Sequence, residues 1–125
     1  MSPIKTFDSW AWVEYFRGSR SGAEVKALLE GKEVLFTPAI CLAEIRAKYL
    51  REGHDPADRM RFIKSRTSII DVDAAVAEHA ADLKIREGLH MVDAIILACA
   101  QSRNSEMVTG DKHFHGISNV VMLPG

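Results

Sequence analysis

The chain has 125 residues, 16 basic and 17 acidic side chains, and 47% hydrophobic residues. This length fits one domain, residues 1–125, and the near-zero net charge excludes a global field that attracts nucleic acid or membranes. Any such partner must bind a local patch. No apolar run approaches the roughly 20 residues of a membrane span, and no signal-peptide pattern opens the chain, so a cytoplasmic protein is expected.

The first half of the chain alternates strand and helix signals. Short β-branched and aromatic runs predict strands, and apolar residues three and four positions apart predict helices. The expected elements are a strand at 4–7, a helix from 9 to about 16, a polar turn at 17–22, a helix at 23–29, a strand at 34–37, and helices at 40–52 and 57–65. Asp8 follows the first strand, Ser9 is a suitable cap for the first helix, and Pro38 closes the second strand.

The second half continues this alternation. The expected elements are a strand at 68–72, a helix capped by Asp73 that ends at residue 87, a helix at 91–102, and strands at 106–109 and 120–123. Strands that alternate with helices predict an α/β fold, a three-layer α/β/α sandwich with a mostly parallel central sheet of four to five strands. Cys41 and Cys99 lie in apolar helical contexts without metal-ligand spacing, which predicts two buried thiols.

Acidic residues from distant parts of the chain are expected at the carboxyl edge of this sheet, where ligands of parallel α/β proteins bind. They are Asp8, Glu44, Asp93 and Asp111. Two carboxylates about 4 Å apart repel by roughly 4 kcal/mol at an effective dielectric constant of about 20, so such a cluster requires a cation. Oxygen ligands favour Mg²⁺ or Mn²⁺ over Zn²⁺, and carboxylate-held Mg²⁺ most often serves phosphoryl transfer or phosphodiester hydrolysis.

Each of these acidic residues also has a structural interpretation. Asp8 competes with Ser9 as a helix cap, and Glu44 has Lys48 four positions further on as a helix-surface partner. Asp93 lies at a helix N-terminus, and Asp111 after Gly110 is typical of a turn. Only their joint placement points to a metal site.

The motifs VDAIILACA (92–100) and VTGDKHF (108–114), with an early strand that ends in Asp and an AEI helix, resemble the PIN domain. They are most similar to the small VapC-type toxin ribonucleases. The resemblance implies an acidic pocket that holds Mg²⁺ or Mn²⁺ and cleaves RNA, a cognate antitoxin and a homodimer. It assigns catalysis and metal binding to Asp8, Glu44, Asp93 and Asp111, with Thr109 at a hydroxyl position just before the last of them.

The chain departs from the family pattern in two places. Some relatives have a further acidic residue shortly after the final aspartate, where this chain has Lys112 and His113. The pair His113 and His115 is interpreted as surface histidines rather than metal ligands. Trp10 and Trp12 are bulkier than the residues common after the first aspartate, and they belong to an aromatic set that serves the core or an interface.

Contacts to RNA phosphates require local cations. The candidates are Lys48, Arg46 and Arg17, and the alternative is a set of solvated helix faces. A phosphatase of the haloacid dehalogenase type expects a second aspartate where Trp10 stands, and a receiver domain expects an acidic pair near the first strand. The remaining alternative is a catalytically silent PIN-like module that binds RNA or protein.

Overall fold

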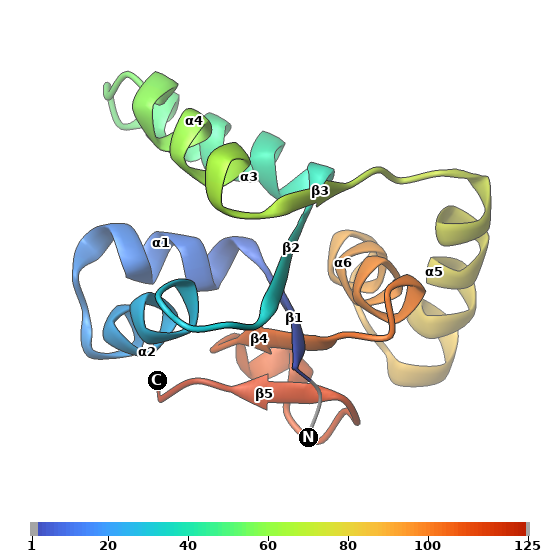
Figure 1. The fold of residues 1–125 in the computed structure, drawn as a ribbon. Coiled ribbons are helices and arrows are strands. Elements are labelled where there is room, and N and C mark those ends of the chain that lie inside the picture. Colours follow the sequence, from blue (N-terminus) through green and yellow to red (C-terminus); the bar gives the residue numbers. More distant parts are fainter. Residues whose placement is uncertain (1–2, 125) are drawn as a thin grey trace.

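Five parallel strands form one sheet in the computed structural model, which describes residues 3–124 (Figure 1). In chain order the strands are β1 (Ile4–Phe7), β2 (Val34–Pro38), β3 (Ser68–Ile70), β4 (Glu106–Thr109) and β5 (Val120–Met122). Their order across the sheet is β3-β2-β1-β4-β5, which makes β1 the central strand. The expected α/β class is confirmed. Residues 1–2 and 125, the ends of the expected domain, lie outside the described residues.

Helices cover both faces of this sheet (Figure 1). They are α1 (Ser9–Arg17), α2 (Arg20–Leu29), α3 (Ala39–Arg51), α4 (Ala57–Arg66), α5 (Ala74–Glu87), α6 (Met91–Ser102) and the short 3-10 helix η1 (Lys112–Phe114). The pair α1 and α2 lies on one side of the sheet, and the pair α5 and α6 lies on the other. None of the described helices has the length and apolar character needed to cross a bilayer.

One helix starts earlier than the sequence predicts. The helix α2 begins at Arg20 rather than at residue 23, so the expected polar turn is shorter. The reason is a cap, because Ser19 Oγ accepts a hydrogen bond from the Gly22 backbone N–H at 3.0 Å. A helix N-terminus needs such an acceptor for its unpaired N–H groups.

The outer strands are shorter than expected. The strand β3 ends at Ile70 instead of residue 72, and β5 ends at Met122 instead of residue 123. Each stops where its neighbour stops, since Ile70 pairs with Pro38 and Met122 pairs with Thr109. Without a partner strand the backbone has no ladder to continue.

The core is packed against β1. Phe7 and Trp12 are fully buried and meet edge to face, with ring centroids 5.5 Å apart. The Trp12 indole N–H donates to Thr37 Oγ1 at 3.0 Å, which satisfies a polar group inside the core. Cys41 and Cys99 are free and buried, as the sequence predicts.

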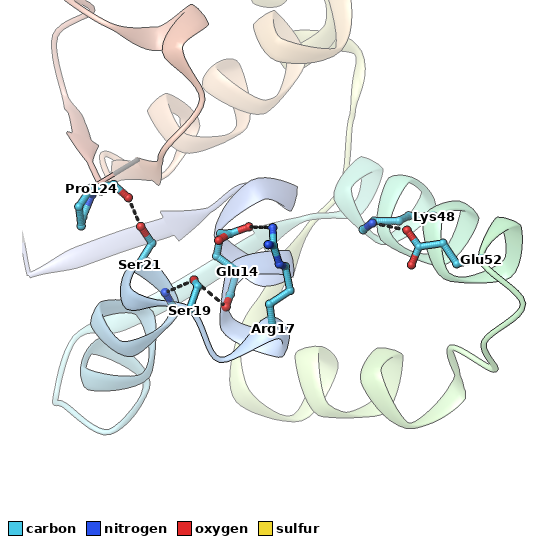
Figure 2. A network of polar contacts seen from close by, with 8 residues as sticks. Glu14, Arg17, Ser19, Ser21, Lys48, Glu52 and Pro124 are labelled. Carbon is cyan, nitrogen blue, oxygen red and sulfur yellow. Dashed lines mark hydrogen bonds and ion pairs between the residues drawn. The ribbon is translucent and has the colours of Figure 1, made fainter.

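The helices α1 and α2 approach each other closely at Gly22. A Cβ on this residue would lie 2.1 Å from the Glu14 carbonyl oxygen and 2.9 Å from the Tyr15 Cα. The Ser21 hydroxyl beside it donates to the Pro124 carbonyl oxygen, which attaches the last described residues to α2 (Figure 2). Because the added Cβ would clash with the backbone of α1, a side chain larger than hydrogen does not fit at position 22.

Gly22→Ala is expected to lower the free energy of unfolding by roughly 1–3 kcal/mol, because the backbone of α1 must move to admit the methyl group. Urea denaturation measures the effect. Gly31→Ala is the matched control, since the atom nearest to its added Cβ, at 2.6 Å, is the flexible end of Glu33. An unchanged unfolding midpoint for Gly22→Ala would contradict this packing.

Candidate metal centre

The register of the sheet brings Asp8 and Thr109 together. Phe7 of β1 pairs with Val108 of β4, so the residues that follow them are neighbours at the carboxyl edge. The Asp8 backbone N–H donates to the Val108 carbonyl oxygen at 3.4 Å. The loop after β4 carries Asp111 to the same edge, as the topology of a parallel sheet requires.

The Asp8 carboxylate is held from two sides. Its Oδ1 accepts a hydrogen bond from the Ala11 N–H at 2.8 Å and caps α1. The prediction that Ser9 caps this helix is therefore wrong, because Ser9 is already its first helical residue. Asp8 Oδ2 accepts a hydrogen bond from the Thr109 hydroxyl, whose oxygen accepts from the Asp111 N–H at 3.0 Å. Thr109 thus connects Asp8 to the loop that carries Asp111.

Burial governs the electrostatics of Asp8, which is 3% exposed. Loss of hydration raises the pKa of Asp8 to about 7, and the negative charges of Asp111 and Glu44 act in the same direction. The hydrogen bonds from Thr109 and Ala11 lower the pKa by stabilising the anion, but they do not offset burial. A cation beside this carboxylate would stabilise its charged form.

Asp93, Asp111 and His113 form the tightest group of potential metal ligands among the described residues. One donor atom from each lies within 4.8 Å of the other two. His113 Nδ1 is 3.2 Å from Asp111 Oδ1 and 3.5 Å from Asp93 Oδ2. Partial burial, and then the charge of Asp111, raise the pKa of Asp93, while His113 and His90 oppose this shift.

His113 is the residue that sequence reasoning undervalued. Its ring is half exposed, as expected of a surface histidine, but its Nδ1 faces two acidic side chains. The available signal was its position two residues after Asp111. The one-turn helix η1, which was not predicted, places His113 there, because Asp111 Oδ1 accepts a hydrogen bond from the His113 backbone N–H at 2.9 Å.

Glu44 lies on α3, where its charge contributes to the raised pKa of Asp8. It is exposed, and its Oε1 accepts a hydrogen bond from the Ser9 hydroxyl at 2.5 Å, a contact that the sequence did not suggest. The structure therefore attaches Glu44 to the start of α1 rather than to the Asp93 and Asp111 carboxylates. Cys41, one turn earlier on α3, is buried beside Asp8, Ser9 and Glu44, and burial raises the pKa of its thiol well above the ordinary value.

The basic residues that were expected to contact RNA do not gather at one place. Lys48 pairs with Glu52 rather than with Glu44, and Figure 2 shows this pair on α3. Arg46 is exposed two residues after Glu44 and so points to another side of the helix. Arg17 ends α1, about 12 Å along the helix axis from Ser9, and pairs with Glu14 at 3.0 Å (Figure 2). The structure does not bring Arg17 to the acidic edge, the carboxyl edge of the sheet where Asp8, Asp93 and Asp111 lie.

Trp10 fixes the loop between Thr109 and Asp111. Its indole lies over Gly110, where an added Cβ would come within 2.1 Å of the ring. The bulky residue after the first aspartate thus packs on the backbone that positions the last aspartate. This contact gives the departure from the family pattern at position 10 a structural role.

The chemistry of the donor set fits a divalent ion. Three carboxylates gather at the edge, and two of them, Asp8 and Asp93, have a raised pKa because their charges are poorly solvated. Among the described residues, the basic group in direct contact with Asp93 and Asp111 is the half-exposed imidazole of His113. Oxygen donors of this kind suit hard dications.

Asp8→Asn is expected to stabilise the metal-free protein at neutral and higher pH. The folded-state pKa of about 7 lies above the ordinary value of 3.8, so the stability contributed by protonated Asp8 is complete below about pH 4 and is lost as the pH rises through 7. Asparagine avoids that loss, with a gain of up to about 4 kcal/mol near pH 8. Chemical denaturation in a chelator, from pH 4 to pH 8, measures the difference. Asp82→Asn, at an exposed position, is the control, and a gain independent of pH would contradict the assignment.

Comparison with known proteins shows which solved structures share this fold. Among solved structures, a toxin-antitoxin complex from Klebsiella pneumoniae has a TM-score of 0.79 and 28% identity, covering 94% of this chain and 96% of that chain. VapC20 of Mycobacterium tuberculosis, described as a toxin that cleaves the sarcin-ricin loop, has a TM-score of 0.77 and 21% identity, covering 96% and 99%. DNA-bound VapBC from Salmonella typhimurium has a TM-score of 0.72 and 21% identity, covering 98% and 97%.

No curated protein matches the chain. The family model that describes the PIN domain matches residues 5–120, from the start of β1 to the start of β5. This range contains every acidic residue of the candidate metal centre. The chain belongs to the PIN domain family.

Proposed function

We propose that this chain, as a single nuclease domain of residues 1–125, is a metal-dependent endoribonuclease and the toxin of a VapBC-type toxin-antitoxin pair. One observation carries the proposal: Asp8, Asp93 and Asp111, from separate parts of the chain, meet at one edge of the sheet. Asp8 is connected to the Asp111 loop through Thr109, and Asp111 to Asp93 through His113. Membership of the PIN family and the similarity to toxin-antitoxin structures support the toxin role.

The residues proposed to hold Mg²⁺ or Mn²⁺ are Asp8, Glu44, Asp93 and Asp111. All four offer carboxylate oxygens, which these ions prefer. When bound, the ion lowers the pKa of a water molecule and neutralises the charge that develops on phosphate oxygens. Glu44 Oε1 accepts a hydrogen bond from the Ser9 hydroxyl. To bind the ion, Glu44 must therefore break this hydrogen bond or use its other carboxylate oxygen.

The protein groups have separate tasks in the proposed hydrolysis. Thr109 holds Asp8 in one orientation, and the cap of α1 fixes the other Asp8 oxygen. Asp111, which is partly exposed, completes the metal shell or orients the attacking water. The water displaces the 3′ oxygen in line, which leaves a 5′-phosphate and a 3′-hydroxyl without a covalent enzyme intermediate.

RNA is proposed to approach along a groove beside the acidic edge. The groove has a volume of about 290 Å³ and is lined by Ser9, Trp10, Val13, Glu44, Ile45, Lys48 and Arg51. Lys48 is the best-placed cation for a phosphate next to the metal, whereas Arg46 and Arg17 would contact more distant phosphates. Trp10 offers an aromatic surface on which an unpaired base can stack.

The proposed partners are a cognate antitoxin and a second copy of the chain in the cytoplasm. Two of the solved structures with similar folds are described as VapBC bound to DNA. Tyr15 and Phe16 of α1 are only partly buried and pack against Phe62 of α4. This partly exposed aromatic surface supports a protein interface on that side of the molecule.

A catalytically silent module is the competing function. It is favoured by one contact, because a protonated His113 between Asp93 and Asp111 would neutralise the acidic group without an ion. The two functions differ in a measurable property. A silent module binds RNA or protein without cleaving RNA, whatever divalent ion is supplied.

Asp93→Asn is expected to reduce RNA cleavage by about a hundredfold, in line with the loss that follows disruption of a metal shell. The assay follows mixed cellular RNA with Mg²⁺ or Mn²⁺, and a chelator should abolish cleavage in the wild type. Asp82→Asn removes an equivalent charge from the exposed surface of α5 and should retain activity. Full activity of Asp93→Asn would refute the proposed site.

Lys48→Gln is expected to weaken RNA binding and to reduce the slope of log affinity against log salt by about one, because one phosphate contact is lost. Binding is measured by titration of single-stranded RNA at several salt concentrations, in an Asp93→Asn background and in the presence of a chelator, which together keep the RNA intact. Arg17→Gln, at the far end of α1, should change the slope less. Equal slopes for wild type and Lys48→Gln would remove Lys48 from the interface.

A further inference from the structure

The backbone at His113 is held in place by hydrogen bonds and by a buried neighbouring residue. Phe114, the next residue, is 1% exposed and anchors η1 in the core. The backbone N–H of His113 is bound by Asp111 Oδ1 at 2.9 Å, and the Phe114 N–H donates to the Asp111 carbonyl oxygen at 3.1 Å. The imidazole is therefore presented to the acidic side chains by a fixed turn.

The spacing of the donor atoms matches neighbouring ligands of one ion. An octahedral dication with bonds of about 2.1 Å places adjacent ligand atoms about 3 Å apart. His113 Nδ1 lies 3.2 Å from Asp111 Oδ1 and 3.5 Å from Asp93 Oδ2. An ion that binds Asp93 and Asp111 thus has the imidazole nitrogen at ligand distance with little movement of the chain.

We propose that His113 is a nitrogen ligand of the divalent ion and makes this centre select Mn²⁺ over Mg²⁺. The inference rests on the proposed function, since it concerns the same ion. Mg²⁺ prefers oxygen donors, whereas affinity for a nitrogen donor rises along the first transition row. His113→Asp would make the set of ligands all oxygen and remove the preference.

The imidazole has a competing role that the same experiment separates. As an imidazolium, His113 would act as an internal cation between Asp93 and Asp111 and would compete with the metal. Lys112 and His90 are the other basic residues near this group, and the His90 ring lies 5.3 Å from the His113 ring. Removal of a ligand weakens metal binding, whereas removal of a competing cation strengthens it.

The test uses the purified full-length chain and two readouts other than activity. Titration calorimetry gives the affinities for Mn²⁺ and Mg²⁺, and pulsed EPR of bound Mn²⁺ detects coupling to a ligand nitrogen. Wild type should bind Mn²⁺ more tightly than Mg²⁺ and show this coupling. In His113→Asp the coupling should disappear, and the ratio of Mn²⁺ to Mg²⁺ affinity should fall about tenfold or more.

His115→Gln and His90→Gln are the matched controls, since both residues are exposed and neither belongs to the ligand group. Both should keep the nitrogen coupling. Coupling lost in His90→Gln but kept in His113→Asp would assign the nitrogen to His90 and overturn the inference. Tighter Mn²⁺ binding by His113→Ala would assign His113 the role of competing cation.

The two proposals fail in different ways. If wild type binds Mn²⁺ and cleaves RNA, but shows no nitrogen coupling and the same metal preference as His113→Asp, only the role of His113 is overturned. If wild type binds neither ion and cleaves no RNA, the proposed function itself fails.

Discussion

The Asp8 carboxylate is buried away from water, at the end of the central strand and at the N-terminus of α1. It persists there because the first turn of α1 and the Thr109 hydroxyl both donate to it. Even so, burial keeps its pKa near 7. A buried acid of this kind reduces stability, and such acids are typical of functional sites.

The topology explains why residues so distant in sequence meet at this acid. Since β1 is central and β4 is its parallel neighbour, the chain segments after both strands emerge side by side. The helix α6, which leads into β4, brings Asp93 from the opposite face. Trp10 and η1 then fix the backbone on either side of Asp111. The site is thus assembled by strand order, and the helix and loop contacts determine where its side chains lie.

Much of this was predictable from the sequence, because strand periodicity and the placement of acids after strands are local signals. The helix α6 and the strand β4 have the predicted boundaries. The start of α2, the length of the outer strands and the cap of α1 were not, since each depends on a choice between neighbouring residues or on a partner strand. The contacts of Ser9 with Glu44 and of His113 with Asp93 depend on tertiary placement, which no spacing in the sequence encodes. The pairs Lys48 with Glu52 and Asp111 with His113 are local, and their spacing is visible in the sequence. Whether the four acidic residues act together on one ion stays a prediction.

The burial of Cys41 beside Asp8 and Glu44 gives the protein a chemical reporter at this edge. Its thiol is neutral and shielded, so alkylating reagents and oxidants reach it only when α3 and the start of α1 separate. The rate of thiol modification therefore measures how often that region opens. A bound metal ion that joins α3 to the strands would slow this opening. The rate of Cys41 modification would then report metal binding without any substrate.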